Sequence, residues 1–261
     1  MVFDKLSNIS ILWITLANKG YIEFTNNFLK SIEIRNIQFN NFVIFCADQD
    51  TFNEFKDRCC CIRVDEVLNK HISSDLSQWQ DNNYKQIVFT KLDVFLYTLK
   101  NTYALGIQHV GYIDMDLVLF SDPTIIMLEH ILKYPETSIF CQCDQNPGDI
   151  PNRMYTCTNV TQCPQICRGM IVVKNNPDLY LLFYYTDSDV KKLLGDQEFL
   201  LAKIYEHNIS YRTIDRYVFA NGCYPYFPAK YVTPDTCAIH FNYLLNNQKK
   251  QFMESVDMWY M

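Results

Sequence analysis

The stretch YIDMDLVLFSDP, residues 112–123, carries two aspartates one residue apart inside an apolar segment. Burial of Asp114 and Asp116 as charges is costly unless a cation neutralises them. A hard divalent cation that also binds phosphate oxygens is the usual partner of such carboxylates. Residues two apart on a strand point to the same face, so both carboxylates can meet one ligand. The stretch therefore predicts a central strand, residues 109–119, that carries an acidic site.

Apolar segments that end in polar residues alternate with amphipathic segments along the rest of the chain. Strands are predicted at residues 9–17, 42–47, 61–64, 138–143, 169–174, 210–214 and 218–220. Helices are predicted at residues 21–34, 51–58, 87–105, 123–130, 177–186 and 195–207. Irregular structure is predicted at residues 65–84 and 145–167. This order is typical of an α/β protein with a mainly parallel central sheet flanked by helices.

Polar residues stand at several of the expected strand ends. Ligands of open parallel sheets bind beyond the carboxyl ends of the strands. Thr15, Asn18 and Asp48 occupy such ends, although each by itself is also an ordinary turn residue. Lys91 is expected in the first turn of its helix, where a cation is slightly unfavourable to the helix dipole. That position favours a functional lysine, and the alternative is a solvated one.

The composition argues against several classes of protein. The formal net charge is −6 with no long basic run, which argues against binding of nucleic acid. No apolar run of about 18 residues and no signal-peptide pattern are present, so no transmembrane segment is expected. The 11 cysteines include the consecutive Cys59, Cys60 and Cys61, which indicates reduced thiols in a cytoplasm. That cytoplasm would be a host's if the chain is viral.

Two chemistries use a pair of aspartates of this kind. In the first, both carboxylates bind a metal ion that neutralises the phosphates of a nucleoside diphosphate. In the second, Asp114 is the nucleophile of a phosphatase of the haloacid-dehalogenase type, whose D-x-D-x-[TV] pattern DMDLV fits. That motif normally lies on the first strand, whereas at least two predicted strands precede it here. The segment GDQEF also lacks the second aspartate of a later Mg²⁺-binding pair. A purely structural pair is the remaining alternative.

Six segments follow one another in an informative order. They are ITLANKGYIEFTNNFLKS, FVIFCADQD, KLDVFLYTLKNTYALGIQHVGYIDMDLVLFSDP, RGMIVVKNNP, GDQEFL, and AIHFN with the later Lys249. In this order they resemble segments of glycosyltransferase family 77, a family of nucleotide-diphospho-sugar transferases. The resemblance implies a GT-A fold. In that fold a Rossmann-like half binds the nucleotide, and a second half with a smaller mixed sheet binds the acceptor.

The resemblance also implies roles for single residues. Three residues would hold Mn²⁺ or Mg²⁺: Asp114, Asp116 and His240. The residues that bind the nucleotide would be Thr15, Asn18, Asp48, Lys91, Asp114 and Lys249. The residues at the sugar and its anomeric carbon would be Asp144, Asp196 and Gln197. The structural alternatives are a core histidine for His240 and a helix N-cap for Asp196.

The chain departs from the family pattern in places. Cys167-Arg168 precedes Gly169 where the family has an asparagine, and Leu245 stands where it has a glycine. Cysteines of the region 141–167 are either reduced and packed or ligands of a structural zinc ion. They are Cys141, Cys143, Cys157, Cys163 and Cys167.

We therefore expect one GT-A domain over residues 1–261. Residues 1–123 would mainly bind the nucleotide, and residues 124–261 would mainly bind the acceptor, the sugar and the metal through the histidine segment. The expected reaction moves a sugar from a nucleoside diphosphate sugar, with UDP as the nucleotide, to a hydroxyl group of a glycan or protein, with retention of configuration. The alternatives are the Asp-nucleophile phosphatase and a protein that binds nucleotide sugars without turnover.

Overall fold

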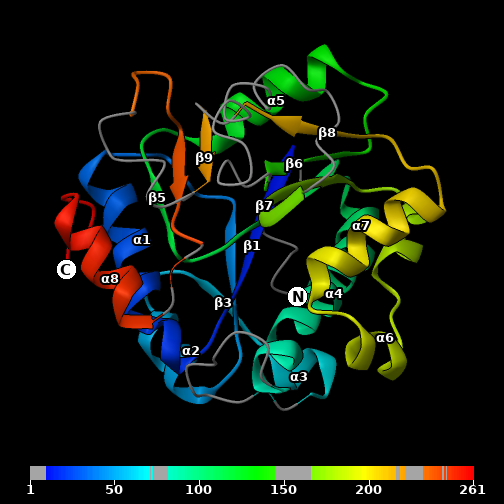
Figure 1. Ribbon diagram of the computed structural model, residues 1–261, viewed down its shortest axis with the longest axis horizontal. Coiled ribbons are helices and arrows are strands. Elements are labelled where there is room, and N and C mark those ends of the chain that lie inside the picture. Colours follow the sequence, from blue (N-terminus) through cyan, green and yellow to red (C-terminus); the bar gives the residue numbers. More distant parts are fainter. Residues whose placement is uncertain are drawn as a thin grey trace. The chain divides into compact units, whose positions relative to one another are not determined.

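The strands of the chain form two sheets. The computed structural model describes residues 10–70, 72, 82–144, 166–215, 218–221, 232–242, 244 and 246–261 (Figure 1). The larger sheet has the order β3 (Cys60–Arg63), β2 (Phe42–Cys46), β1 (Ile11–Ala17), β4 (His109–Ile113), β7 (Ile166–Lys174), β6 (Ile139–Cys143) and β8 (Tyr211–Ile214). The smaller sheet has the order β5 (Leu117–Leu119), β10 (Ala238–His240) and β9 (Phe219–Asn221).

Helices connect most of these strands. Those in the described residues are α1 (Ile22–Ile34), α2 (Gln49–Phe55), α3 (Val64–Leu68), α4 (Asn82–Thr102), α5 (Pro123–Lys133), α6 (Asp187–Lys192), α7 (Asp196–Glu206) and α8 (Asn246–Ser255). Short 3-10 helices are η2 (Lys19–Tyr21), η3 (Tyr103–Leu105) and η6 (Pro177–Phe183). β1 pairs in parallel with β2 and β4, β2 with β3, and β6 with β8. The predicted α/β class, with a mainly parallel main sheet and a smaller mixed sheet, is therefore confirmed.

The packing divides the chain into two compact units built from interleaved stretches of sequence. Unit 1 comprises Met1–Ile22, Asn40–Ile113 and Val172–Ile209. Unit 2 comprises Glu23–Phe39, Asp114–Ile171 and Ser210–Met261. Because one boundary falls directly before Asp114, both aspartates of the acidic stretch belong to unit 2.

Unit 1 is organised on β1 and β2, whose residues are all buried. Strands covered on both faces carry continuous apolar runs, and ILWITLA and FVIFC are such runs. At β4, Gly111 leaves room for the ring of Trp13, because a Cβ at that position would overlap the indole. α4 continues into η3, whose C-cap is Gly106 with a left-handed φ of 77°.

The predicted placement of Lys91 in a first helical turn is wrong. α4 begins at Asn82, so Lys91 lies in the middle of the helix and the argument from the helix dipole does not apply. The polar residues before the apolar pattern continue the helix, which the pattern alone does not reveal. Lys91 Nζ lies 5.3 Å from the ring centroid of Tyr112, a cation–π contact within unit 1.

Other local predictions also need correction. Residues 65–84 are not wholly irregular, since α3 extends to Leu68 and α4 begins at Asn82. The segment from Pro177 is a 3-10 helix that ends at Phe183, and Thr186 is the N-cap of a separate helix, α6. Thr186 and Asp189 form a capping box there, in which each side chain accepts a hydrogen bond from the other's backbone N–H.

His109, on β4, makes the stability of unit 1 depend on pH. Burial, with a smaller contribution from the charge of Lys174, lowers the pKa of His109 from 6.5 to about 4, although a hydrogen bond with the Ser10 backbone opposes the shift. Below pH 6.5 the unfolded chain therefore binds a proton that the folded chain excludes, so stability falls as the pH falls towards 4. We expect His109 to account for a loss of about 2–3 kcal/mol between pH 7 and pH 4.5.

Urea unfolding at the two pH values measures this loss. The variant His109→Gln, which has no titrating ring, should lose about 2–3 kcal/mol less than the wild type between them. An equal loss in the two proteins would contradict the assignment to His109.

Unit 2 contains the smaller sheet together with α1 and α8. In Figure 1, α1 and α8 lie side by side. Lys250 pairs with Glu23 across them at 2.9 Å, and the Asn27 side chain bonds the backbone of Met258 and Tyr260. Ser31 Oγ of α1 accepts a hydrogen bond from the Leu119 N–H of β5. These contacts join α8 and the residues after it to α1, and α1 to the small sheet.

The single strand predicted over residues 109–119 is also wrong. It is two strands, β4 and β5, which belong to different sheets and are separated by Asp114, Met115 and Asp116. The apolar residues on both sides are each buried in a sheet, so the hydrophobic pattern hides the turn between them. The aspartates therefore lie where the backbone leaves one sheet for the other. No described helix is both long enough and apolar enough to span a membrane.

Candidate metal centre

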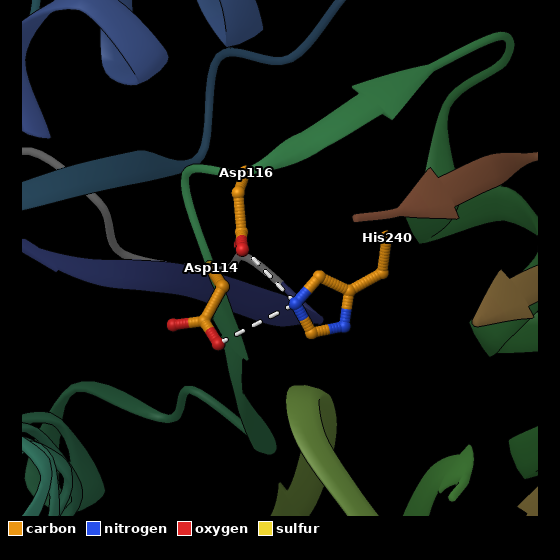
Figure 2. Close-up of side chains that lie close together, drawn as sticks. All are labelled: Asp114, Asp116 and His240. Carbon is orange, nitrogen blue, oxygen red and sulfur yellow. Dashed lines mark ion pairs between the residues drawn. The ribbon is translucent and has the colours of Figure 1, made fainter. Parts of the chain in front are cut away.

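The side chains of Asp114, Asp116 and His240 converge on one point in unit 2. Figure 2 shows the Nε2 atom of the His240 ring facing both carboxylates. Nε2 lies 3.1 Å from Asp116 Oδ1 and 3.8 Å from Asp114 Oδ2. One ligand-type atom from each residue lies within 4.8 Å of the others. Asp116 and His240 are buried, whereas the Asp114 side chain is 21% exposed, so the group opens on the side of Asp114.

The backbone around the group is fixed by hydrogen bonds from several strands. The Asp114 N–H donates to Gly169 O of β7 at 2.8 Å, and the Phe241 N–H donates to Asp116 O at 3.0 Å. His240 ends β10, where it pairs with Leu117 of β5 and Asn221 of β9. The carboxylates thus come from the turn before β5, and the imidazole comes from the strand beside it.

Asp116 also has a cationic neighbour, Lys249. Lys249 Nζ of α8 donates to Asp116 Oδ2, while Oδ1 of the same carboxylate faces His240. Lys249 is itself buried, and its Nζ lies 5.7 Å from the ring centroid of Phe24. Burial raises the pKa of Asp116, but the charge of Lys249 and the contacts with Lys249 and His240 outweigh it and hold the pKa below its usual range. Asp116 is therefore an ionised carboxylate with one oxygen directed to each neighbour.

The other ring nitrogen of His240 faces away from the carboxylates. Nδ1 lies 3.2 Å from Gln142 Oε1 and 3.5 Å from Cys167 Sγ. Burial, and next the charge of Asp144, raises the pKa of the Cys167 thiol, so this sulfur is not a thiolate. One face of the ring lies against the backbone of Gly169, where a Cβ would overlap the imidazole. The observed position of the His240 ring therefore requires glycine at residue 169.

The donor set suits a hard divalent cation. Two carboxylates and an imidazole nitrogen are ligands that Mn²⁺ and Mg²⁺ accept. Within the described residues this is the only group of three or more acidic, histidine or cysteine side chains spaced to hold a metal ion. Of the cysteines proposed for zinc, Cys157 and Cys163 lie outside the described residues.

Asp144 follows β6 in the same unit and lies next to two asparagines. Its Oδ1 accepts hydrogen bonds from Asn221 Nδ2 at 2.8 Å and from Asn242 Nδ2 at 3.3 Å. The Oδ1 atoms of both asparagines are buried without a hydrogen-bond partner. Asn242 Nδ2 also lies 3.8 Å from Cys167 Sγ, which itself contacts His240. Asp144 thus belongs to a polar cluster beside the imidazole, and its predicted contact with the sugar stays a prediction.

The remaining predicted residues lie in unit 1. Asp48 is the N-cap of α2, where it accepts hydrogen bonds from Thr51 N–H at 2.8 Å and from Lys19 N–H at 2.7 Å. The turn alternative therefore describes the contacts that Asp48 makes. Thr15 and Asn18 are buried at the end of β1, and the Oγ1 atom of Thr15 has no hydrogen-bond partner. Their nucleotide contacts stay predictions, as does that of Lys91.

Asp196 and Gln197 begin α7. The N-cap of this helix is Gly195, so the alternative role of Asp196 as the N-cap is wrong. Asp196 is the first helical residue and is buried. An acidic residue there is favourable to the helix dipole, which gives the position a structural reason besides any catalytic one.

Three residues of the site were not singled out as ligands or supports in the sequence. They are Gln142, Gly169 and Asn221. Gln142 is the polar residue within the otherwise apolar strand β6, and Asn221 ends a short apolar strand. A polar side chain in a fully buried strand needs a partner, and that rule would have marked both positions. The sequence gives no separate reason to select Gly169, because the His240 ring that lies against it belongs to a distant part of the chain.

A family model for the nucleotide-diphospho-sugar transferases matches residues 38–253. No curated protein sequence matches the chain. Among solved structures, mouse xyloside xylosyltransferase 1 in its apo form is 14% identical with a TM-score of 0.52, over 90% of this chain and 98% of that one.

Two further structures are similar over almost the whole chain. A glycosyltransferase involved in glycosylation of the major capsid of PBCV-1 is 11% identical with a TM-score of 0.52, over 95% of this chain and 100% of that one. The glycosyltransferase GlyE of Streptococcus pneumoniae TIGR4 is 13% identical with a TM-score of 0.51, over 96% of this chain and 61% of that one. At these identities the similarity shows the fold alone, which is that of GT-A glycosyltransferases.

Proposed function

The chain belongs to the family of nucleotide-diphospho-sugar transferases, and from this membership we propose that it transfers a sugar from a UDP-sugar to a hydroxyl group of a glycan or protein. The proposal includes Mn²⁺ or Mg²⁺ as the cofactor and Asp114, Asp116 and His240 as its ligands. The observation that carries it is the convergence of these three side chains within 4.8 Å. Membership in this family leaves the Asp-nucleophile phosphatase without support.

The two aspartates differ in their surroundings, which suggests a division of work. Asp116 is buried and held by Lys249, so its position does not depend on substrate. Asp114 is more exposed, and its backbone N–H is tied to Gly169 O. We therefore assign Asp116 and His240 as the fixed part of the metal centre and Asp114 as the ligand that the donor also contacts. When bound, the cation would neutralise the charge that develops on the diphosphate.

The transfer itself exchanges one bond at the anomeric carbon. The bond from this carbon to the diphosphate oxygen breaks, a bond to the acceptor oxygen forms, and the acceptor hydroxyl loses its proton to a base. A diphosphate leaves with its electron pair, so a positive environment on the leaving side lowers the barrier. We assign Lys249, whose buried ammonium lies next to Asp116, to that side.

The other predicted site residues are assigned to the sugar and the nucleotide without a detailed role. We assign Asp144 to the donor sugar, where the amide groups of Asn221 and Asn242 already surround its carboxylate. Asp196 and Gln197 would lie near the anomeric carbon, and Thr15, Asn18, Asp48 and Lys91 near the nucleotide. These assignments and retention of configuration rest on the resemblance to family 77. The eight cysteines of the described residues are free thiols, which supports action in a reducing compartment such as a cytoplasm.

Release of UDP from a panel of UDP-sugars tests the proposed function. The purified chain is incubated with UDP-glucose, UDP-galactose, UDP-xylose and UDP-N-acetylglucosamine, with Mn²⁺, with Mg²⁺ or with EDTA. We expect at least one donor to release UDP, EDTA to abolish the release, and added Mn²⁺ to restore it. Anomeric coupling constants of the product then report the stereochemistry.

Two results would contradict the proposal. Binding of UDP without release from any donor would indicate a nucleotide-sugar-binding protein. Phosphate covalently trapped on Asp114 would indicate the phosphatase.

A further inference from the structure

Gln142 contacts the imidazole of His240 from the side opposite the metal centre. It lies on β6, is completely buried, and its Oε1 lies 3.2 Å from His240 Nδ1. A fully buried amide in an apolar strand must satisfy both of its ends, so its contacts reveal what it does.

The orientation of the Gln142 amide is fixed by backbone carbonyls. Its Nε2 donates to Phe219 O at 3.5 Å and to Ala220 O at 3.4 Å, both on β9. Carbonyl oxygens only accept, so the NH₂ group must face them, and the amide oxygen must face His240. Because an amide oxygen cannot donate, the hydrogen bond across 3.2 Å requires a proton on His240 Nδ1.

That requirement matters because the carboxylates favour the opposite tautomer. Nε2 lies 3.1 Å from Asp116 Oδ1, so a neutral ring with its proton on Nε2 would donate to Asp116. In that tautomer the nitrogen nearest the carboxylates has no free lone pair for a cation. Cys167 Sγ, at 3.5 Å from Nδ1, is a weaker acceptor than an amide oxygen and competes poorly for the Nδ1 proton.

We infer that Gln142 is a positioning residue that keeps the proton of neutral His240 on Nδ1 and thereby presents the Nε2 lone pair to a divalent cation between Asp114 and Asp116. This inference deepens the proposed function and rests on it. A partner at the second ring nitrogen fixes the tautomer and orientation of a metal-binding histidine, and its loss typically lowers metal affinity about 10–100-fold. Gln142 does this through β9, the strand that also pairs with β10 at His240.

The test compares Gln142→Met, which has similar size but no acceptor, with Gln142→Glu, which keeps an oxygen at the same place. Affinity for Mn²⁺ alone is measured from the electron paramagnetic resonance signal of the free ion. We expect a loss of about 10–100-fold in Gln142→Met and a smaller loss in Gln142→Glu. Cys167→Ala removes the other neighbour of Nδ1 and should change the affinity less than threefold.

A spectroscopic readout separates positioning from a general loss of structure. Nitrogen-15 spectra of the metal-free proteins are recorded at a pH high enough that the His240 signals no longer change with pH. The variant His240→Gln is used to assign the His240 signals. The wild type and Gln142→Glu should show the proton on Nδ1, and Gln142→Met should show it shifted towards Nε2. Circular dichroism establishes whether each variant is folded. If Gln142→Met does not fold, the comparison is made between the wild type and Gln142→Glu.

The possible outcomes distinguish this inference from the proposed function. Unchanged Mn²⁺ affinity and an unchanged tautomer in Gln142→Met would overturn the inference while the metal centre stands. A loss of affinity in Cys167→Ala equal to that in Gln142→Met would also overturn it, because the packing around the ring would then be the cause. A wild type that binds no Mn²⁺, alone or with UDP, would instead refute the proposed function.

Discussion

Replacement of Asp116 with asparagine is expected to lower the affinity for Mn²⁺ by at least about 100-fold and to lower UDP release by a similar factor. Asparagine keeps the shape of the side chain but removes the charge that faces both His240 and Lys249. The same change deprives the buried ammonium of Lys249 of this countercharge. Breaking one side of a buried ion pair costs about 3–5 kcal/mol, so a marked fall in stability should accompany the loss of function. Calorimetric titration with Mn²⁺ and urea unfolding measure the two effects.

A second substitution separates the metal role of Asp116 from its structural role. In Asp116→Asn/Lys249→Met the buried charge is also removed, and replacement of both partners of a buried pair is often neutral for stability. We therefore expect stability to recover in the double variant while Mn²⁺ binding stays lost. Recovery of metal binding together with stability would mean that Asp116 is only the structural partner of Lys249.

Asp93 offers a matched carboxylate control. It accepts from Lys70 Nζ at 2.7 Å and from the Tyr185 hydroxyl at 2.6 Å, within unit 1. Asp93→Asn should lower stability and leave the affinity for Mn²⁺ unchanged. A fall in Mn²⁺ affinity there would show that the measurement reports general loss of structure.

Gly169→Ala is expected to disturb the metal centre although the residue carries no ligand. The added Cβ would overlap the His240 ring, which is also confined by Gln142, Cys167 and Asp116. The ring must move, and we expect a loss of about 10–100-fold in Mn²⁺ affinity. Overpacking of a buried site should also cost about 1–3 kcal/mol of stability. Manganese titration and urea unfolding of the variant check both values.

A double-mutant cycle attributes the effect of Gly169→Ala to the imidazole. In a His240→Ala background the ring is absent, so the extra methyl group should be tolerated at little cost. The two substitutions should therefore be strongly non-additive in stability. Gly195→Ala is the matched control, since its Cβ would lie 3.7 Å from Val88 in ordinary contact, and Mn²⁺ affinity should not change. Additive costs at Gly169 and His240 would contradict the proposed contact.

The sheet could be predicted because its strands are short apolar runs with polar ends. ILWITLA and FVIFC become β1 and β2 within two residues of the expected bounds, since both faces of these parallel strands are buried. The division of residues 109–119 into β4 and β5 could not be predicted, because both halves are apolar and buried. The hydrophobic pattern indicates that a residue is buried, but it does not indicate in which sheet the residue lies. The same limit hid the true start of α4, whose first turn is polar.

The ligand group was accessible from the sequence, whereas its supports were not. Asp114 and Asp116 suggest a metal by their chemistry and spacing, the resemblance to family 77 adds His240, and the structure brings the three together. Gln142 and Gly169 act through contacts with a histidine that lies 98 residues from Gln142 along the chain. Neither residue type by itself indicates such a role, because glutamine and glycine are common in strands and turns. The pairing of Lys249 with Asp116 likewise depends on where α8 packs against α1.

Anomalous diffraction from a crystal grown with Mn²⁺ and UDP tests the central claim most directly. We predict one manganese peak bonded to Asp116 Oδ1 and His240 Nε2, with Asp114 and phosphate oxygens of UDP completing its ligands. Data collected above and below the manganese absorption edge would identify the ion. Bound UDP without a manganese peak at these residues, or a peak elsewhere in the chain, would contradict the proposed metal centre.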